Sequence, residues 1–330
     1  MSNKIRKEPA SWPVPFSSFI INRSIMNFQK IQGLITATFS PFDSKGRLDL
    51  DVIPAYAAHL KKNGIVGVFI NGTTGEGASL TLSEKKALTA AWAPYNSADF
   101  KVIAMVSGTS QREGVELAEF AQEQGLYGIS ANAPFYVKPG SVESLADFLK
   151  PIAEVAPNLA FYFYHIPLLT QVNLSMVKLL DEVEGKIPNF AGIKYTHTDL
   201  MEFNQCLRHQ NSKFDILWGW DEMLLAGLAM GAKGGVGSTY NYAAPLYHEL
   251  VKAFEEKDLS KALALQEKSI DIISRYSRFG GAVAGKAILK FCGIDCGDFR
   301  SPGNQLSETK RQELYEELAQ IGFLPTSASV

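Results

Sequence analysis

The chain has 330 residues, of which 46% are hydrophobic and 20% charged, and its 32 Lys and Arg nearly balance its 34 Asp and Glu. This composition is typical of a globular protein with a sizeable core and excludes a disordered or fibrous chain. The charges are mixed along the chain without a basic stripe, so we expect no nucleic-acid partner. No apolar stretch is long and continuous enough for a membrane span, so we expect no membrane partner either.

The cysteines and the first residues bear on where the protein resides. Cys206, Cys292 and Cys296 are too few and odd in number for a disulfide framework, which favours a reducing, cytoplasmic compartment. Residues 1–28 begin with basic residues, but prolines and serines interrupt the apolar part and no convincing cleavage site follows. We therefore expect a disordered N-terminal tail there.

From residue 31 onward, short apolar runs alternate with longer stretches of helical period, a pattern that indicates β-α-β units with parallel strands. Helix signals lie between the runs, such as a capping box at Thr81 and Glu84 and a stop at Gly231. Eight such units favour a closed (β/α)8 or TIM barrel over residues 29–242 rather than an open doubly wound sheet. The predicted strands are 33–39, 66–71, 101–106, 127–133, 159–165, 190–195, 214–219 and 234–239.

Beyond the last predicted strand the pattern is helical, with clear stretches at 246–257, 259–279 and 307–320. We expect residues 243–330 to form a C-terminal helical extension of the barrel. Active sites of such barrels lie where the strands end and the following loops begin, so these are the positions to search for chemistry.

A loop rich in glycine and hydroxyl groups, NGTTGEGASL, follows the second predicted strand. It lacks the lysine of a Walker phosphate loop, and Leu80 stands where a dinucleotide fingerprint needs its last glycine. What remains is a tight turn whose backbone N–H groups and Thr73 and Thr74 hydroxyls suit a small carboxylate. An ordinary glycine turn is the alternative that the loop alone leaves open.

Lys194 ends the apolar run FAGIK and is expected at the barrel mouth. Burial disfavours the charged ammonium, lowers its pKa and makes the free amine available as a nucleophile. Tyr164 ends the preceding strand, and a phenol beside an amine can shuttle protons during imine formation and C–C cleavage. Taken singly, Lys194 can equally be a solvated lysine and Tyr164 an ordinary strand aromatic.

The seventh predicted strand runs into GWDE, which places Asp221 and Glu222 at the mouth and at a helix start. Two carboxylates there can accept hydrogen bonds from a polyol, or simply complement the helix dipole. No histidine stands at ligand spacing from them, so we expect no metal.

Five motifs, in this order, carry a family resemblance: GTTGE, YHIP, GIKYT, GWDE and GSTYN. Together they resemble the N-acetylneuraminate lyase branch of the class I aldolase and dihydrodipicolinate synthase superfamily, from about residue 31 to the C-terminus. The resemblance implies pyruvate, N-acetylneuraminate and N-acetylmannosamine as ligands, no cofactor and a homotetramer.

The resemblance also implies a role for each site residue. Lys194 corresponds to the Schiff-base lysine and Tyr164 to the acid/base phenol, while Tyr136 corresponds to a tyrosine that supports the catalytic tyrosine across a subunit contact. Thr73 and Thr74 correspond to the residues that hold the pyruvyl carboxylate. The sugar end of the pocket is implied to be lined by Thr196, Gly219, Asp221, Glu222 and Ser238.

Sequence differences between members of the superfamily help to decide which branch this chain resembles. Dihydrodipicolinate synthases are expected to carry an arginine just after the tyrosine motif, but this chain has Leu168 and Leu169 there. Trp220 stands at the second position of the GWDE motif, which varies within the family. Three alternatives remain open. The first is another pyruvate-dependent aldolase that cleaves a 2-keto-3-deoxy sugar acid, and the second is a barrel that binds sugar acids without catalysis. The third is an assembly protein that uses the C-terminal helices and binds no small molecule.

Overall fold

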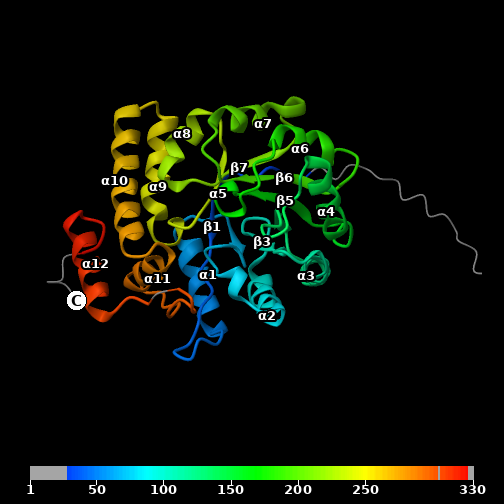
Figure 1. Cartoon of the computed structure of the whole chain (residues 1–330). Helices are drawn as coiled ribbons and strands as arrows, with labels where there is room; N and C mark the ends of the chain where they lie inside the picture. The colour runs from blue at the N-terminus through cyan, green and yellow to red at the C-terminus, as the bar shows by residue number, and fades with distance from the viewer. Residues whose placement is uncertain (1–27, 304, 326–330) are drawn as a thin grey trace, which may run out of the picture.

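The computed structural model describes residues 28–303 and 305–325, so the predicted tail lies outside the described residues apart from Phe28. Eight parallel strands form a closed barrel in which each strand pairs with the next and β8 pairs with β1 (Figure 1). Every strand lies within its predicted range, and the predicted barrel is confirmed. The strands are β1 (Gly33–Ala37), β2 (Gly67–Ile70), β3 (Lys101–Met105), β4 (Gly128–Asn132), β5 (Ala160–His165), β6 (Phe190–Tyr195), β7 (Asp215–Trp218) and β8 (Gly234–Gly237).

Helices surround the barrel (Figure 1). The predicted capping box is confirmed, with Thr81 and Glu84 bonded reciprocally at the start of α2, and Gly231 follows α8 with a φ of +109°. The longer helices are α1 (Ile53–Lys62), α2 (Leu82–Trp92), α3 (Gln111–Glu123), α4 (Val142–Glu154), α6 (Met176–Val183), α7 (Leu200–Ser212), α8 (Leu224–Ala229) and α9 (Tyr240–Glu255). Shorter turns are α5 (Pro167–Thr170), η1 (Leu50–Val52), η2 (Gly77–Ser79), η3 (Ala93–Tyr95) and η4 (Asp221–Met223).

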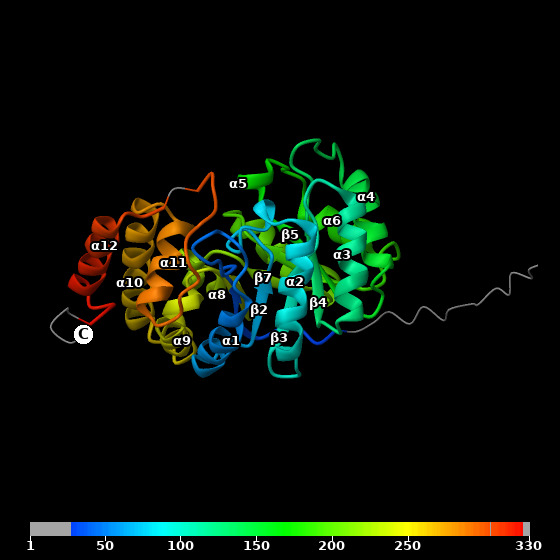
Figure 2. The same ribbon diagram turned by 90° about the horizontal axis from the view of Figure 1, so that it is seen from below.

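Three further helices form a C-terminal extension beside α9, as Figure 2 shows: α10 (Leu259–Arg278), α11 (Ala282–Phe291) and α12 (Glu308–Gln320). The predicted limit at residue 242 falls within α9, and the division of the chain into barrel and extension stays a prediction. Among the described residues, no helix is long and apolar enough to cross a membrane.

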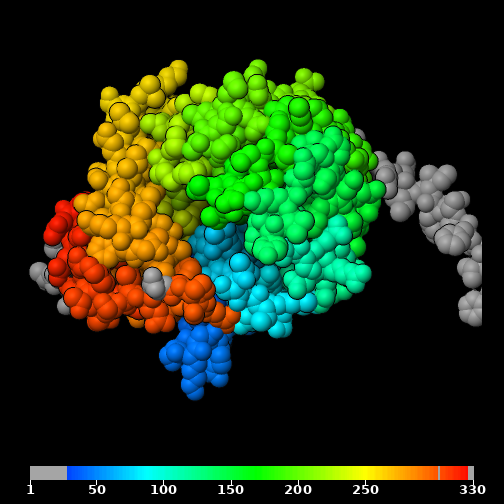
Figure 3. All heavy atoms as spheres, in the orientation of Figure 1, coloured from blue at the N-terminus to red at the C-terminus, as the bar shows by residue number. Residues whose placement is uncertain are grey.

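Two apolar clusters hold the barrel together. One fills its interior with side chains such as Ile35, Phe69 and Tyr162, and the larger one lies between the strands and the helices. Because both faces of a strand are covered, β5 and β6 are buried along their whole length. The carboxyl ends of the strands lie on the face seen in Figure 3, and the molecule is hollowed at the centre of this face.

Candidate active site

Lys194 and Tyr164 lie side by side inside the barrel. They are register partners on the adjacent strands β6 and β5, so their side chains point the same way. Lys194 Nζ lies 4.0 Å from the centroid of the Tyr164 ring and 4.2 Å from that of Phe69. Among the described residues Nζ makes no hydrogen bond or ion pair, which leaves its nitrogen available to react.

Burial changes the protonation of this lysine. Only 5% of Lys194 is exposed, and desolvation of the ammonium lowers its pKa from 10.5 to about 7, although the negative charge of Asp221 opposes the shift. Burial therefore favours the free amine at neutral pH, where an exposed lysine is protonated. An uncharged amine in a barrel mouth is a competent nucleophile toward a carbonyl carbon.

The pKa of the Tyr164 phenol is shifted in the opposite direction. Burial raises its pKa to about 12, while the hydroxyls of Thr73 and Thr196 lower it in part. Thr196 Oγ1 is itself buried and has no hydrogen bond of good geometry within the described residues, so its interaction with the phenol is a weak one. The phenol is protonated at neutral pH and can act first as a proton donor.

The loop after β2 brings its threonines to the same place. Thr73 is exposed and Thr74 half-buried, and Thr73 is close enough to Tyr164 to influence its pKa. Two backbone hydrogen bonds fold the loop, from Glu76 N to the Thr73 carbonyl at 3.1 Å and from Gly77 N to the Gly72 carbonyl at 2.9 Å. These threonines can offer hydroxyl groups to a small anion at the barrel mouth.

The two predicted carboxylates differ in their surroundings. Asp221 is buried and its Oδ2 accepts hydrogen bonds from Thr239 N at 2.8 Å and Thr239 Oγ1 at 2.6 Å, whereas Glu222 is half-buried. Burial raises the pKa of both groups, and the Thr239 hydrogen bonds lower that of Asp221. Ser238 is half-buried beside them and lies close enough to the Tyr276 phenol of α10 to lower its pKa in part, although burial raises that pKa overall. Glu222 is thus the freer of the two carboxylates.

Gly219 occupies a position that no larger residue can fill. A Cβ atom there would lie 2.0 Å from Thr196 Oγ1 and 3.0 Å from the Tyr195 carbonyl oxygen. Gly219 therefore lets β7 approach the end of β6 closely, which places Thr196 next to the GWDE turn.

Tyr136 does not join the other predicted site residues in the barrel. It lies on the loop after β4 with 87% of its surface exposed. Neighbouring apolar side chains are also exposed, and Lys138 Nζ on this loop donates to Gln171 Oε1 at 2.8 Å, which joins the loop to α5. We define the apolar loop patch as Phe135, Tyr136, Val137, Leu168 and Leu169.

Sequence reasoning missed two residues that shape the site. Phe69 faces the barrel interior and packs against Tyr164 with ring centroids 5.6 Å apart, a position that its place in an alternating strand could have signalled. Tyr276 lies far along the chain in α10, where no local pattern marks it. In the described part of the chain, no three His, Cys, Asp or Glu side chains gather as a metal site would require.

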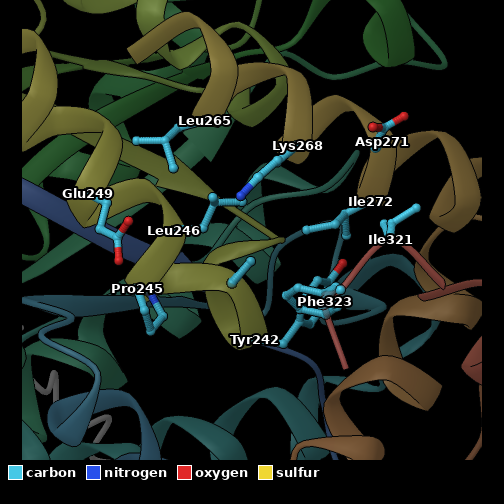
Figure 4. Close-up of a pocket in the computed structure, with 12 residues that line it drawn as sticks. Tyr242, Pro245, Leu246, Glu249, Leu265, Lys268, Asp271, Ile272, Ile321 and Phe323 are labelled. Atoms are coloured by element: carbon cyan, nitrogen blue, oxygen red, sulfur yellow. The ribbon is translucent and has the colours of Figure 1, made fainter. Parts of the chain in front are cut away.

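A separate cavity of about 390 Å³ lies outside the barrel, between α9, α10 and the segment after α12 (Figure 4). Leu246, Leu265, Ile272 and Phe323 line it, and Lys268 stands at its side. None of the predicted site residues borders this cavity.

Comparison with known proteins extends over nearly the whole chain. Residues 30–321 match the model of the dihydrodipicolinate synthetase family. Over 301 residues the chain is 40% identical to a Homo sapiens protein named N-acetylneuraminate lyase, covering 90% of this chain and 94% of that protein.

Solved structures agree with the sequence match. The N-acetylneuraminate lyase of Proteus mirabilis superposes with a TM-score of 0.87 at 35% identity, covering 90% of this chain and 100% of that one. The N-acetylneuraminate lyase, or sialic acid aldolase, of Aliivibrio salmonicida gives a TM-score of 0.87 at 36% identity, with 90% and 99% covered. The similarity includes the C-terminal helices as well as the barrel.

Proposed function

The chain belongs to the dihydrodipicolinate synthetase family, and we propose that within it this protein is a class I aldolase that cleaves N-acetylneuraminate to N-acetylmannosamine and pyruvate. The observation that carries the proposal is the buried Lys194 amine, whose pKa is about 7 and whose Nζ lies 4.0 Å from the centre of the Tyr164 ring. The similarity to proteins named N-acetylneuraminate lyase supports the choice of substrate.

In the first half of the reaction, the neutral Lys194 amine attacks the C2 ketone of open-chain N-acetylneuraminate to give a carbinolamine. The Tyr164 phenol, protonated in the free protein, donates its proton as the C2 hydroxyl leaves as water. The protonated imine that results withdraws electrons from C3, so the reaction needs no metal or organic cofactor.

In the second half, the Tyr164 phenolate accepts the proton of the C4 hydroxyl while the C3–C4 bond breaks. N-acetylmannosamine leaves with a C1 aldehyde, and the bonding electrons form an enamine on Lys194. Protonation of the enamine at C3 and hydrolysis of the imine release pyruvate and restore the amine. Each proton that Tyr164 donates is thus recovered within the cycle.

The remaining site residues act on the two ends of the substrate. The Thr73 and Thr74 hydroxyls hold the C1 carboxylate and so orient the ketone toward Lys194. Thr196, Gly219, Glu222 and Ser238 line the sugar end, where carboxylate and hydroxyl groups match a polyhydroxylated chain. Asp221 supports this end through Thr239, and its negative charge partly offsets the effect of burial on the pKa of Lys194.

We also propose that the protein is a cytoplasmic homotetramer in which Tyr136 contacts the active site of a neighbouring subunit. The apolar loop patch supports this assembly, because five large apolar side chains exposed together are unusual unless another surface covers them. Three free cysteines, two of them buried, suit a reducing compartment. Sedimentation of the wild type and of Tyr136→Asp tests the assembly, since a charge in a covered patch is expected to dissociate the subunits.

The activity is tested by coupling pyruvate release to lactate dehydrogenase with N-acetylneuraminate and, separately, a 2-keto-3-deoxy sugar acid as substrates. Turnover of N-acetylneuraminate with the higher kcat/KM is expected. The reverse preference would reassign the protein to another pyruvate-dependent aldolase, and release from neither would refute the proposed chemistry.

A further inference from the structure

A fully buried ion pair connects the C-terminal extension to the carboxylate-binding loop. Lys286 Nζ of α11 lies 2.8 Å from Glu76 Oε1, and each side chain is only 2–3% exposed. Glu76 belongs to the loop that carries Thr73 and Thr74, yet neither member of the pair has a part in the proposed chemistry. A buried ion pair seldom increases stability over an apolar pair, so its presence calls for another explanation.

Both charges are held by further contacts. Glu76 Oε2 accepts a hydrogen bond from Arg300 N at 2.8 Å, and Lys286 Nζ donates to the Asp298 carbonyl at 3.1 Å. Lys286 Nζ also lies 4.3 Å from the centroid of the Phe42 ring. Burial lowers the pKa of Lys286, and the charge of Glu76 opposes this change.

The backbone transmits the position of Glu76 to the threonines. Glu76 has a left-handed φ of 56° and its N–H bonds to the Thr73 carbonyl at 3.1 Å, while the Gly75 carbonyl accepts from Ser40 Oγ at 2.6 Å. A non-glycine residue in this conformation is strained and needs its surroundings to hold it. The side-chain contacts of Glu76 provide that restraint, only two residues after Thr74.

We propose that the Lys286–Glu76 ion pair is a positioning device that fixes the Thr73–Thr74 loop for the carboxylate of the 2-keto acid. The inference rests on the proposed function, because it assigns the loop to the pyruvyl carboxylate. Lys286 and Glu76 are positioning residues, and their effect reaches the substrate only through the loop.

The test compares two ketones that differ in charge. Pyruvate and its neutral methyl ester both present a ketone to Lys194, but only pyruvate carries the carboxylate that the loop is proposed to hold. Borohydride reduces the imine to a stable adduct, so the half-saturating concentration of each ketone can be measured by mass spectrometry on the full-length protein. The ratio of the two half-saturating concentrations reports on how well the loop holds the carboxylate. It is insensitive to a general loss of Lys194 reactivity.

Lys286→Met is expected to raise the half-saturating concentration of pyruvate by about tenfold or more, the size of one lost hydrogen bond to a charged group. The value for methyl pyruvate is expected to change by less than about threefold on the same scale. Lys290→Met is the matched control: it makes the same change of charge on the same helix and removes an exposed ion pair to Asp295, but it leaves the Lys286–Glu76 pair intact. This control is expected to leave the ratio unchanged.

The double variant Lys286→Met, Glu76→Gln covers the case in which the single variant does not fold. It leaves no unpaired buried charge and does not alter the net charge, so general attraction of the anion is preserved. The same selective loss for pyruvate is expected. A folded variant with the wild-type ratio, or with both ketones weakened equally, would overturn the inference alone, whereas a wild type that traps neither ketone would refute the proposed function.

Discussion

Lys194 and Tyr164 are register partners on adjacent parallel strands, and the amine lies over the face of the phenol ring at 4.0 Å from its centroid. The same burial moves their pKa values in opposite directions, down to about 7 for the lysine and up to about 12 for the tyrosine. A neutral nucleophile and a protonated acid therefore coexist at neutral pH. This combination suits formation of an imine, in which an amine attacks and a hydroxyl leaves.

Imine formation is predicted to depend on pH with a midpoint near 7. The pKa of Lys194 is lowered by burial, so the reactive amine appears as pH rises through about 7 and is protonated below it. The initial rate of adduct formation with pyruvate, measured by rapid quench from pH 5 to 9, should rise and then level off. A midpoint near 10 would show that the ammonium is solvated.

Asp221 is predicted to tune that midpoint. Its negative charge raises the pKa of Lys194, so Asp221→Asn should move the midpoint to lower pH. Glu222→Gln is the matched control, because the charge that raises the pKa of Lys194 is that of Asp221. Equal shifts in both variants would contradict a specific effect of Asp221.

Tyr164→Phe is predicted to retain the fold and slow turnover by about a hundredfold or more, the usual contribution of a positioned acid/base group. The ring of the variant still packs against Phe69, so the barrel interior stays filled. Adduct formation with pyruvate at long incubation times should still reach completion, since the nucleophile is intact. Steady-state kinetics with N-acetylneuraminate provide the measurement, and an unchanged kcat would remove Tyr164 from the mechanism.

Glu222→Gln is predicted to weaken binding at the sugar end of the pocket selectively. Loss of a hydrogen bond to a charged acceptor should lower kcat/KM for N-acetylneuraminate by about tenfold. Half-saturation of pyruvate trapping should stay at the wild-type value, because pyruvate lacks the polyol. A parallel loss for both ligands would indicate damage to the whole pocket.

Asp215, at the opposite end of the barrel, is predicted to make stability depend on pH. Its Oδ2 accepts from Tyr162 Oη at 2.9 Å and Ile31 N at 3.1 Å, yet burial raises its pKa from 3.8 to about 6. A raised pKa means that its contribution to stability is complete below pH 3.8 and is lost as pH rises through about 6. The shift corresponds to roughly 3 kcal/mol at 1.36 kcal/mol per pKa unit.

Urea unfolding of the wild type and Asp215→Asn at pH 4 to 8 measures this effect. The unfolding free energy of the wild type minus that of Asp215→Asn should fall with rising pH over that range. A constant difference would mean that Asp215 titrates alike in the folded and unfolded chains.

Local sequence predicted most of the fold because β-α-β units carry their signals within short windows. Buried parallel strands appear as apolar runs, and Thr81 with Glu84 marks a helix start regardless of its surroundings. Helix α11 is less marked: Ala284 to Leu289 are all buried, so the alternation of polar and apolar faces that signals a surface helix is absent.

The site was predictable only where strand order brings residues together. Lys194 and Tyr164 end neighbouring strands, so their proximity follows from the barrel, and the family motifs mark the same positions. The Lys286–Glu76 pair and the Tyr276 contact with Ser238 join segments far apart in the chain, and no periodicity encodes them. The surroundings of Asp221 also differ from those expected of a free carboxylate at the barrel mouth, because Thr239 donates hydrogen bonds to it.

The central claim is that Lys194 forms the imine, and peptide mapping after borohydride reduction tests it most directly. Wild type and Lys194→Ala would each be incubated with pyruvate, reduced and digested, with pyruvate release from N-acetylneuraminate measured in parallel. The account predicts a single pyruvyl adduct on Lys194, none in the variant, and pyruvate release by the wild type alone. An adduct on another lysine, or release that survives in Lys194→Ala, would contradict it.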